Sequence, residues 1–230
     1  MTNQSSFEEV QKALLQQLQI LGKDQSFGFK VDSTILTLDV QYKDEFGYVG
    51  IDVLNWESND HQVYISKELV TVDYEPGYFA FREGPILQNA VEKFIRSSGI
   101  TPALLIIDGH GTAHPRKMGL ASWLGIKMGI PSIGVAKESL LPIKYDLAEE
   151  ALSTFDLIQN DEIVGTVLRT QTGIKPVFVS AGHLISQKES VNIIQQLRGE
   201  YRIIEPIRRA DQAARKYAKG IVEEGFIELD

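Results

Sequence analysis

An apolar run that ends abruptly in an acid and two glycines is the stretch that most constrains how this chain can fold. Residues 103–111 read ALLIIDGHG, so Asp108 follows five apolar residues and is itself followed by Gly109 and Gly111. A short unbroken Leu and Ile run bounded by turn residues is typical of a strand buried on both faces. Ligands bind at the carboxyl ends of such strands in open α/β sheets. We therefore predict that Asp108 lies at the mouth of a site. For this stretch taken alone, the alternative is a tight strand-to-helix turn that Asp108 caps.

Length and composition indicate one α/β domain. The 230 residues are 43% hydrophobic and show no break in composition, which suits one sizeable core. We expect a single domain over residues 1–230, with an amphipathic N-terminal helix in residues 1–24 and an acidic tail at 223–230. The sequence has no signal segment and no apolar stretch close to the roughly 20 residues that span a bilayer, so we expect a cytoplasmic protein without membrane association.

The absence of cysteine limits the metals that the chain could bind. Without Cys there are no disulfides and no thiolate ligands, so oxygen or imidazole groups must hold any metal. This favours magnesium or manganese over structural zinc. The formal net charge of −8 argues against nonspecific binding of nucleic acid by the whole surface. A local positive rim is still compatible with the sequence, because basic residues such as Arg82, Arg116 and Arg208 lie next to the motifs described below.

Alternation of apolar residues and turn signals predict a mixed central β-sheet with helices on both faces. We expect Pro85, Pro115 and Pro206 each to open a helix, with Glu83 just before the first of them. The remaining expectations are a strand in each of 34–42, 48–54, 62–69, 103–108, 131–137, 162–169 and 175–180, a helix in 187–197, an irregular segment at 73–83 and a surface helix or excursion at 144–161.

Three carboxylates fall where separate predicted elements begin, end or are interrupted. Asp39 lies inside the strand at 34–42, Glu83 precedes a helix, and Asp108 ends the central strand; Asp211 could join them from the C-terminal helix. An interior strand Asp costs on the order of several kcal/mol when it is buried without a partner or ion, so Asp39 is a functional candidate. Oxygen-rich sites suit Mg²⁺, which makes a bound water nucleophilic and stabilises charge in phosphodiester cleavage. The pattern alone predicts a metal-dependent phosphoryl-transfer enzyme.

Two further residues could serve such a reaction. Lys137 ends the strand at 131–137 and could position a scissile phosphate, while Tyr74 and Tyr78 could stack against a base. Each also has a plainer interpretation: Lys137 as a solvated charge at a strand end, Tyr74 as packing at a rim, and Asp211 as an acid on a helix surface.

Four blocks of the sequence resemble the signature blocks of the endonuclease V family, in the same order and at compatible spacing. They are PGYFAFRE at 76–83, IDGHGTAHPR at 107–116, IGVAK at 133–137 and EPIRRAD at 205–211. The resemblance runs from about residue 34 to 219, and the second block is highly specific. It implies an RNase H-like fold and a Mg²⁺-dependent endonuclease, with Mn²⁺ able to substitute. Such an enzyme cuts at the second phosphodiester bond 3′ to a deaminated base, chiefly inosine, and leaves 3′-hydroxyl and 5′-phosphate ends. The implied partner is nucleic acid containing deaminated bases, DNA before RNA, and we expect a monomer.

The same resemblance assigns roles by position. It makes Lys137 the catalytic lysine. The acids of the catalytic metal site would be Asp39, Glu83, Asp108 and Asp211. The base pocket would consist of Gly77, Phe79, Gly109, Gly111 and His114, and the wedge that separates strands around the lesion would contain Tyr74 and Pro76.

The wedge departs from the family pattern. The usual Pro-Tyr-Ile-Pro run appears here as Asp73-Tyr74-Glu75-Pro76, and the two acids would meet phosphates or stacked bases unfavourably. We hypothesise intact chemistry with altered substrate engagement. Three alternatives stay open at this stage: an inosine-specific endoribonuclease or single-strand-preferring variant, a non-catalytic protein that binds inosine-containing nucleic acid, and an RNase H-like nuclease for another target such as a branched junction.

Overall fold

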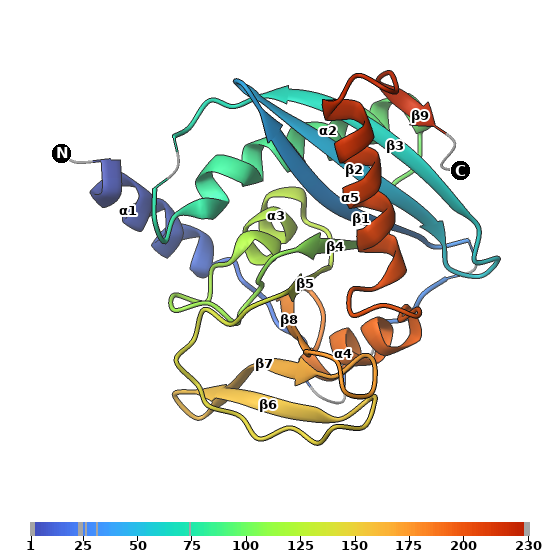
Figure 1. The fold of residues 1–230 in the computed structure, drawn as a ribbon. Helices are drawn as coiled ribbons and strands as arrows, with labels where there is room; N and C mark the ends of the chain where they lie inside the picture. The colour runs from blue at the N-terminus through green and yellow to red at the C-terminus, as the bar shows by residue number, and fades with distance from the viewer. Residues whose placement is uncertain (1–2, 23–24, 26, 31, 74, 228–230) are drawn as a thin grey trace.

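The chain forms a twisted mixed β-sheet with helices on both faces (Figure 1). This computed structural model describes residues 3–22, 25, 27–30, 32–73 and 75–227. The strands are β1 (Thr34–Lys43), β2 (Phe46–Asn55), β3 (His61–Leu69), β4 (Leu104–Asp108), β5 (Ser132–Ala136), β6 (Thr154–Gln159), β7 (Glu162–Leu168), β8 (Val177–His183) and β9 (Gly225–Ile227). Nine strands of the described chain join one sheet in the order β6-β7-β8-β5-β4-β1-β2-β3-β9.

The centre of the sheet is parallel and its two wings are antiparallel. β4 pairs in parallel with β1 and with β5, whereas the other neighbouring strands pair antiparallel. The carboxyl ends of β1, β4 and β5 therefore meet at one edge, where an open α/β sheet places its site. The predicted meander and the predicted pair of strands around Gly173 are confirmed.

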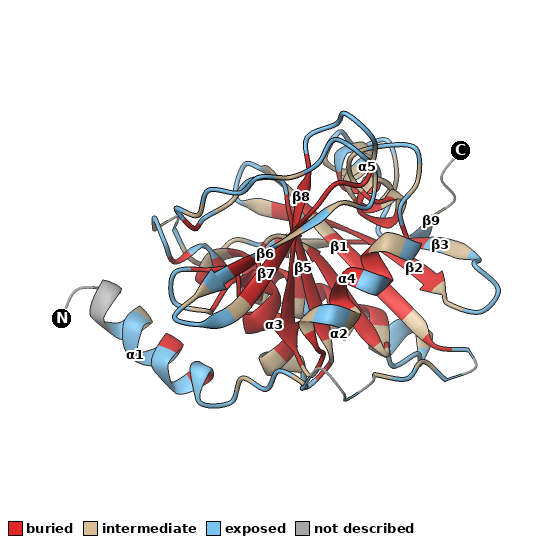
Figure 2. Ribbon diagram, turned by 90° about the horizontal axis from the view of Figure 1, so that it is seen from below, coloured by how far each residue is buried: buried red, intermediate tan, exposed pale blue. Residues whose placement is uncertain are grey.

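Two layers of helix cover the sheet. The helices are α1 (Asn3–Leu15), α2 (Phe79–Ser98), α3 (Leu120–Met128), α4 (Gln187–Gln196) and α5 (Glu205–Ala218). Residues of α2 and α3 pack with Leu38 and Ile107 on one face, and residues of α4 and α5 pack with Ile35 and Ile106 on the other. The strands between the layers are buried almost throughout (Figure 2). The prediction of a mixed sheet with helices on both faces is confirmed.

Both ends of the chain differ from the sequence-based prediction. The N-terminal helix ends at Leu15 instead of continuing toward residue 24. Residues 19–21 instead bond to the segment after β8, where Gln19 O accepts from Leu184 N at 2.7 Å and Ile185 O from Leu21 N at 3.3 Å. Within the segment 223–230, expected as an acidic tail, β9 pairs with β3 and covers its edge. At both ends, backbone hydrogen bonds to other segments thus take the place of the helical turns and the solvated backbone that the local sequence pattern predicts.

The start of α2 is also different, because Pro85 lies inside this helix and not at its first position. The helix begins at Phe79 and buries Ala80, Phe81 and Glu83. The ring of Phe81 stacks on Phe7 of α1, with 4.4 Å between centroids. This tertiary packing outweighs the loss of one helical hydrogen bond at the proline.

Two further predictions were wrong. Pro115 does not open a helix; α3 begins only at Leu120, after Gly119 has packed against the carbonyl of His110, where a Cβ would lie 2.2 Å from that oxygen. The segment 144–161, predicted as a surface helix or excursion, is irregular up to Ser153 and contains no helix, but its second half forms the strand β6, which pairs with β7 and so extends the sheet. In the described part of the chain, no helix is long and apolar enough to cross a membrane.

Candidate active site

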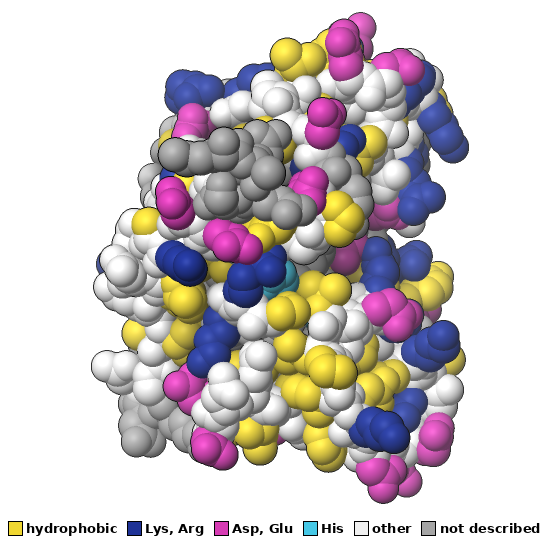
Figure 3. Space-filling view, turned by 90° about the vertical axis from the view of Figure 1, so that its left-hand side faces the viewer, with side chains coloured by type: hydrophobic (Ala, Val, Ile, Leu, Met, Phe, Trp, Pro, Cys, Tyr) yellow, Lys and Arg dark blue, Asp and Glu magenta, His cyan; other side chains and the backbone are white. Residues whose placement is uncertain are grey.

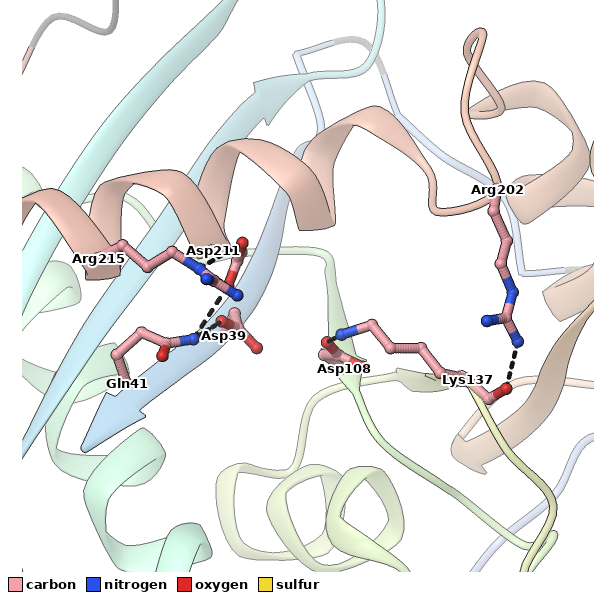
Figure 4. Close-up of polar contacts among 7 residues, drawn as sticks. All are labelled: Asp39, Gln41, Asp108, Lys137, Arg202, Asp211 and Arg215. Atoms are coloured by element: carbon pink, nitrogen blue, oxygen red, sulfur yellow. Dashed lines mark hydrogen bonds and ion pairs between the residues drawn. The ribbon is translucent and has the colours of Figure 1, made fainter.

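Asp39 and Asp108 lie side by side where the parallel pairing of β1 with β4 ends; Asp108 is the last residue of β4, whereas β1 continues to Lys43. The parallel ladder pairs Leu38 with Ile107, so the next residue along each strand is one of the two acids. Side chains alternate between the faces of a strand, and Leu38 and Ile107 both point into the core beneath α2 and α3. The two carboxylates therefore share the opposite face, which α5 covers (Figure 4).

Asp211 reaches these acids from α5. Gln41 Nε2 donates to Asp211 Oδ1 at 2.9 Å and, with a longer contact of 3.3 Å, to Asp39 Oδ2. Arg215 Nε donates to both carboxylate oxygens of Asp211, at 2.8 and 2.9 Å. Figure 4 shows Asp39, Asp108 and Asp211 grouped between β1, β4 and α5.

The close approach of α5 depends on Gly50 of β2. Gly50 is the register partner of Asp39, and a Cβ on it would lie 2.0 Å from the carbonyl oxygen of Ala210. The backbone of α5 thus occupies the space of a missing side chain. Because Asp211 directly follows Ala210, this contact places its carboxylate opposite Asp39.

Glu83 approaches from α2. It is only 5% exposed, and Tyr42 Oη donates to its Oε2 at 3.0 Å. Burial raises the pKa of Glu83 to about 8, with Asp39 and Asp108 adding to the shift and the hydrogen bond from Tyr42 opposing it. Burial likewise raises the pKa of Asp39 to about 7, reinforced by the charges of Asp108 and Asp211. Asp108 therefore lies close enough to Asp39 and Glu83 for its charge to disfavour their ionisation.

Lys137 supplies a positive charge to this group. It follows β5 directly, and its Nζ forms an ion pair with Asp108 Oδ2. Burial works against the charged amine, but the pairing with Asp108 outweighs it and raises the pKa of Lys137. Lys137 is therefore protonated at neutral pH and can act as a donor to an anion, not as a base.

Arg202 holds the backbone from which Lys137 projects. Its Nη2 donates to the carbonyl oxygen of Lys137 and, at 2.8 Å, to that of Pro176, while Nε donates to Pro176 O at 3.2 Å. One guanidinium thus joins the end of β5 to the start of β8, and Figure 4 shows its contact with Lys137.

The donor chemistry of the site fits a hard divalent cation. Asp39, Asp108 and Asp211 offer carboxylate oxygens at one place, and a cation would offset the burial and the neighbouring negative charges that raise the pKa of Asp39. As they stand, no three acidic or histidine side chains among the described residues form a complete set of metal ligands. Lys137, Gln41 and Arg215 occupy carboxylate oxygens instead, so a bound ion would take over part of their role.

The backbone N–H groups of the two glycines after Asp108 are bonded within the protein, and Gly111 also allows close packing. Gly109 N donates to Val135 O at 3.1 Å, and Gly111 N donates to Ser180 Oγ at 2.8 Å. A Cβ at Gly111 would lie 2.2 Å from the carbonyl oxygen of Ala181. Both N–H groups are thus engaged within the protein, and a base pocket at this loop would use other groups.

Arg116 connects two other residues of the predicted base pocket. Its Nη2 donates to the carbonyl oxygen of Gly77, and its backbone N donates to His114 Nδ1 at 3.2 Å. His114 is 7% exposed, and burial, with Arg116 nearby, lowers its pKa to about 4. Phe79 is 41% exposed at the start of α2. The segments around Gly77 and His114 therefore form one surface.

The predicted wedge is only partly visible. Tyr74 lies outside the described residues. Asp73 and Pro76 on either side of it are exposed. Their exposure is compatible with contact to a substrate.

Comparison with the profiles of known protein families shows to which family this chain belongs. The Endonuclease V family profile matches residues 16–212. This chain belongs to the endonuclease V family. The resemblance of the four sequence blocks is thereby confirmed.

Individual endonuclease V proteins agree with the profile. Endonuclease V of Nostoc punctiforme is 42% identical over 144 residues, which are 63% of this chain and 63% of that protein. The match thus spans less than two thirds of this relative's length. The crystal structure of endonuclease V from Streptomyces avermitilis is 32% identical, covers 94% of this chain and 93% of its own, and superposes with a TM-score of 0.82.

A more distant structure has the same fold. Endonuclease V of Ciona intestinalis, in complex with a 24mer DNA containing an inosine followed by a ribo-adenosine, is 24% identical and superposes with a TM-score of 0.81 over 96% of this chain and 99% of its own. Endonuclease V structures have the RNase H-like fold, so the predicted fold class is confirmed.

Several residues that shape this endonuclease V site were not singled out from the sequence. Tyr42, Gly50 and Arg202 act through partners 41, 160 and 65 positions away. A glycine inside a strand often marks the close approach of another backbone, so the contact at Gly50 could have been predicted from the sequence. Arg202 lies in a loop whose local sequence carries no comparable signal.

Proposed function

We propose that this protein is a metal-dependent endonuclease that nicks nucleic acid at the second phosphodiester bond 3′ to inosine, leaving 3′-hydroxyl and 5′-phosphate ends. The observation that carries the proposal is the meeting of Asp39, Asp108 and Asp211 with Lys137 where the parallel pairing of β1 with β4 ends, in a chain of the endonuclease V family. The inosine-containing DNA bound by the Ciona relative supports the choice of substrate.

The proposed roles follow from the chemistry of the groups. Asp39, Asp108, Asp211 and Glu83 would hold Mg²⁺, for which Mn²⁺ could substitute, and such an ion would supply a more acidic water and stabilisation of charge on the attacking and leaving oxygens. Lys137, charged at neutral pH, binds a non-bridging oxygen of the scissile phosphate and stabilises its growing negative charge. Tyr42 holds the Glu83 carboxyl in place.

The deaminated base would leave the stack and enter a pocket lined by Gly77, Phe79, Gly109, Gly111 and His114. A deaminated base mispairs, which lowers the cost of unstacking it and contributes to selectivity. Because His114 is neutral at physiological pH, it can donate from one ring nitrogen while Nδ1 accepts from Arg116. Gly77 and Phe79 add an exposed backbone turn and ring.

A cleavage assay tests the proposal. End-labelled strands with one inosine, in single-stranded DNA, duplex DNA and RNA, are incubated with Mg²⁺ or Mn²⁺ and resolved on denaturing gels. We expect a nick at the second bond 3′ to inosine, and about 100-fold or greater loss of activity in Asp108→Ala. Asp146→Ala, which removes an exposed acid, is the matched control. Binding without nicking under either metal would instead indicate a non-catalytic inosine binder.

A preference for single strands or RNA is a second candidate, favoured by the acids of the wedge. Asp73 is exposed, and Glu75 lies in the same segment, so both would repel phosphates of a duplex. We expect the native protein to cut single strands or RNA faster than duplex, and Asp73→Pro combined with Glu75→Ile to raise duplex cleavage selectively. Equal, strong cutting of duplex by the native protein would contradict this preference.

A further inference from the structure

A cavity lies beside the base loop, between α1 and the turn that follows His114. Its volume is about 470 Å³, and its lining comes from two segments. They contribute Glu8, Gln11, Lys12 and Leu15 from α1, and Pro115, Arg116 and Lys117 from the turn. Ligand pockets measure roughly 300–1,000 Å³, so this cavity can hold one nucleotide. It is separate from the acids and Lys137.

The charge of the lining favours an anion. Three of the lining side chains are cationic and one is acidic. Glu8 accepts a hydrogen bond from Tyr78 Oη at 2.9 Å, and Lys117 pairs with Glu162. Lys12 is exposed and has no ion-pair or hydrogen-bond partner within the part of the chain that the structure describes. Figure 3 shows Lys and Arg side chains beside exposed apolar ones on the side of the molecule that faces left in Figure 1.

Gln11 adds an unused hydrogen-bond donor. The residue is only 4% exposed, and its Oε1 accepts from Arg116 Nε at 2.6 Å. Its Nε2 is buried and has no partner among the described residues. Buried polar groups are normally hydrogen-bonded, and Gln11 is one of the residues that line the cavity, so its unpaired amide points to an acceptor on a ligand.

Arg116 joins this cavity to the proposed base pocket. The same guanidinium that contacts Gln11 donates to Gly77 O and lies 4.5 Å from the ring centroid of Tyr78. Its backbone N bonds to His114. The cavity and the pocket therefore share one wall, so a strand whose base enters the pocket brings its neighbouring nucleotide to the cavity.

We propose that this cavity is a subsite for the nucleotide on the 5′ side of the inosine; this rests on the function proposed above. Because the cut lies 3′ to the lesion, the 3′ nucleotides run toward the acids. Figures 1 and 2 place α1 on one side of the sheet and α5, which carries Asp211, on the other. Leu15 and Pro115 contact the base, Gln11 donates to a base or sugar oxygen, and Lys12 binds the phosphate.

An abasic scan tests the subsite. Single-stranded inosine oligonucleotides each carry one abasic residue at a different position on either side of the lesion. We expect an abasic residue at the 5′ neighbour to raise KM about tenfold, because it removes the contacts of the base with Leu15 and Pro115, with a smaller change in kcat. Fluorescence anisotropy of the same oligonucleotides reports binding independently of cleavage.

Variants locate the effect in the cavity. Lys12→Ala, at an exposed position, and the double variant Gln11→Leu/Lys12→Ala should raise KM for the intact oligonucleotide and lose most of the response to the abasic 5′ neighbour. Lys188→Ala on α4 removes an exposed charge elsewhere and should behave like the native protein. Thermal melting confirms that each variant is folded.

The two proposals fail in different ways. A native protein that does not cut inosine substrates refutes the function, while anisotropy still decides whether the 5′ neighbour is bound in the cavity. A native protein that cuts but ignores the 5′ neighbour, or variants that keep the native KM and the native response, would overturn the subsite and leave the function standing.

Discussion

Asp52 of β2 is paired with Arg209 of α5, with 2.9 Å between Asp52 Oδ1 and Arg209 Nε. Asp52 is fully buried, and His61 Nδ1 lies 2.9 Å from its other oxygen. Because Arg209 precedes Asp211 by two residues, this group of charges ties α5 to the sheet close to the acid that α5 contributes. This ion pair, in which Asp52 is buried and Arg209 is partly exposed, thus supports the position of α5 without contacting the site acids directly.

Removing Asp52 should destabilise the protein strongly. Asp52→Ala leaves Arg209 and His61 without their shared partner and leaves a small cavity in the sheet face. We expect the free energy of unfolding in urea to fall by about 3 kcal/mol. Asp60→Ala, at an exposed position after β2, should change it by less than about 0.5 kcal/mol. Identical unfolding midpoints for the two variants would contradict this role of Asp52.

A side chain at Gly50 should push α5 away from the acids. In Gly50→Ala the new Cβ would meet the backbone of Ala210, which cannot move without the helix. We expect a loss of about 1–3 kcal/mol in stability and a higher Mg²⁺ concentration for half-maximal cleavage. Gly28→Ala, where a Cβ would meet nothing within 4 Å, is the control. An unchanged Mg²⁺ requirement in Gly50→Ala would show that Asp211 does not depend on this contact.

Arg202 should act on catalysis through Lys137. Arg202→Ala removes the bonds to the carbonyl oxygens of Lys137 and Pro176. The backbone of Lys137 is then no longer held in place, so its amine is positioned less accurately. We expect kcat to fall about tenfold while KM changes little, since a small misplacement of a charge-stabilising group affects the transition state most. Arg198→Ala, which removes an exposed Arg from the same loop, should retain native kcat. A change confined to KM would assign Arg202 to substrate binding instead.

His114 should make stability depend on pH. Its pKa is about 4 in the folded protein against 6.5 ordinarily, so the unfolded chain binds more protons between these values. Stability contributed by neutral His114 is therefore present above pH 6.5 and is lost as the pH falls toward 4. We expect a loss on the order of 3 kcal/mol relative to His114→Asn, whose amide oxygen can still accept from Arg116 N.

The pH experiment compares the two proteins by urea unfolding across pH 4 to 7. Other titrating groups, including Asp39 and Glu83, are common to both and cancel in the difference. Parallel stability curves for the native protein and His114→Asn would show that His114 is not held neutral by burial.

Asp39 and Asp108 could be predicted because each interrupts or ends an apolar strand pattern that is legible over a few residues. The parallel register of β1 and β4 then places them together, as the strand-end argument anticipates. Glu83 was expected ahead of a helix opened by Pro85. The structure puts it inside α2, because packing of Phe81 on Phe7 starts the helix earlier.

The sequence by itself determined the central strands, the positions of Asp39 and Asp108 on them and, through four blocks of residues, the endonuclease V family. These features are local, because apolar periodicity and turn residues can be recognised within a few neighbouring residues of the sequence. Only the tertiary structure decided that α5 lies against Gly50, that Arg202 holds the backbone of Lys137 and that α1 leaves a cavity beside Arg116. Those contacts join residues from 65 to 160 positions apart, and their partners are chosen by packing and hydrogen bonding of the folded chain, not by any local pattern.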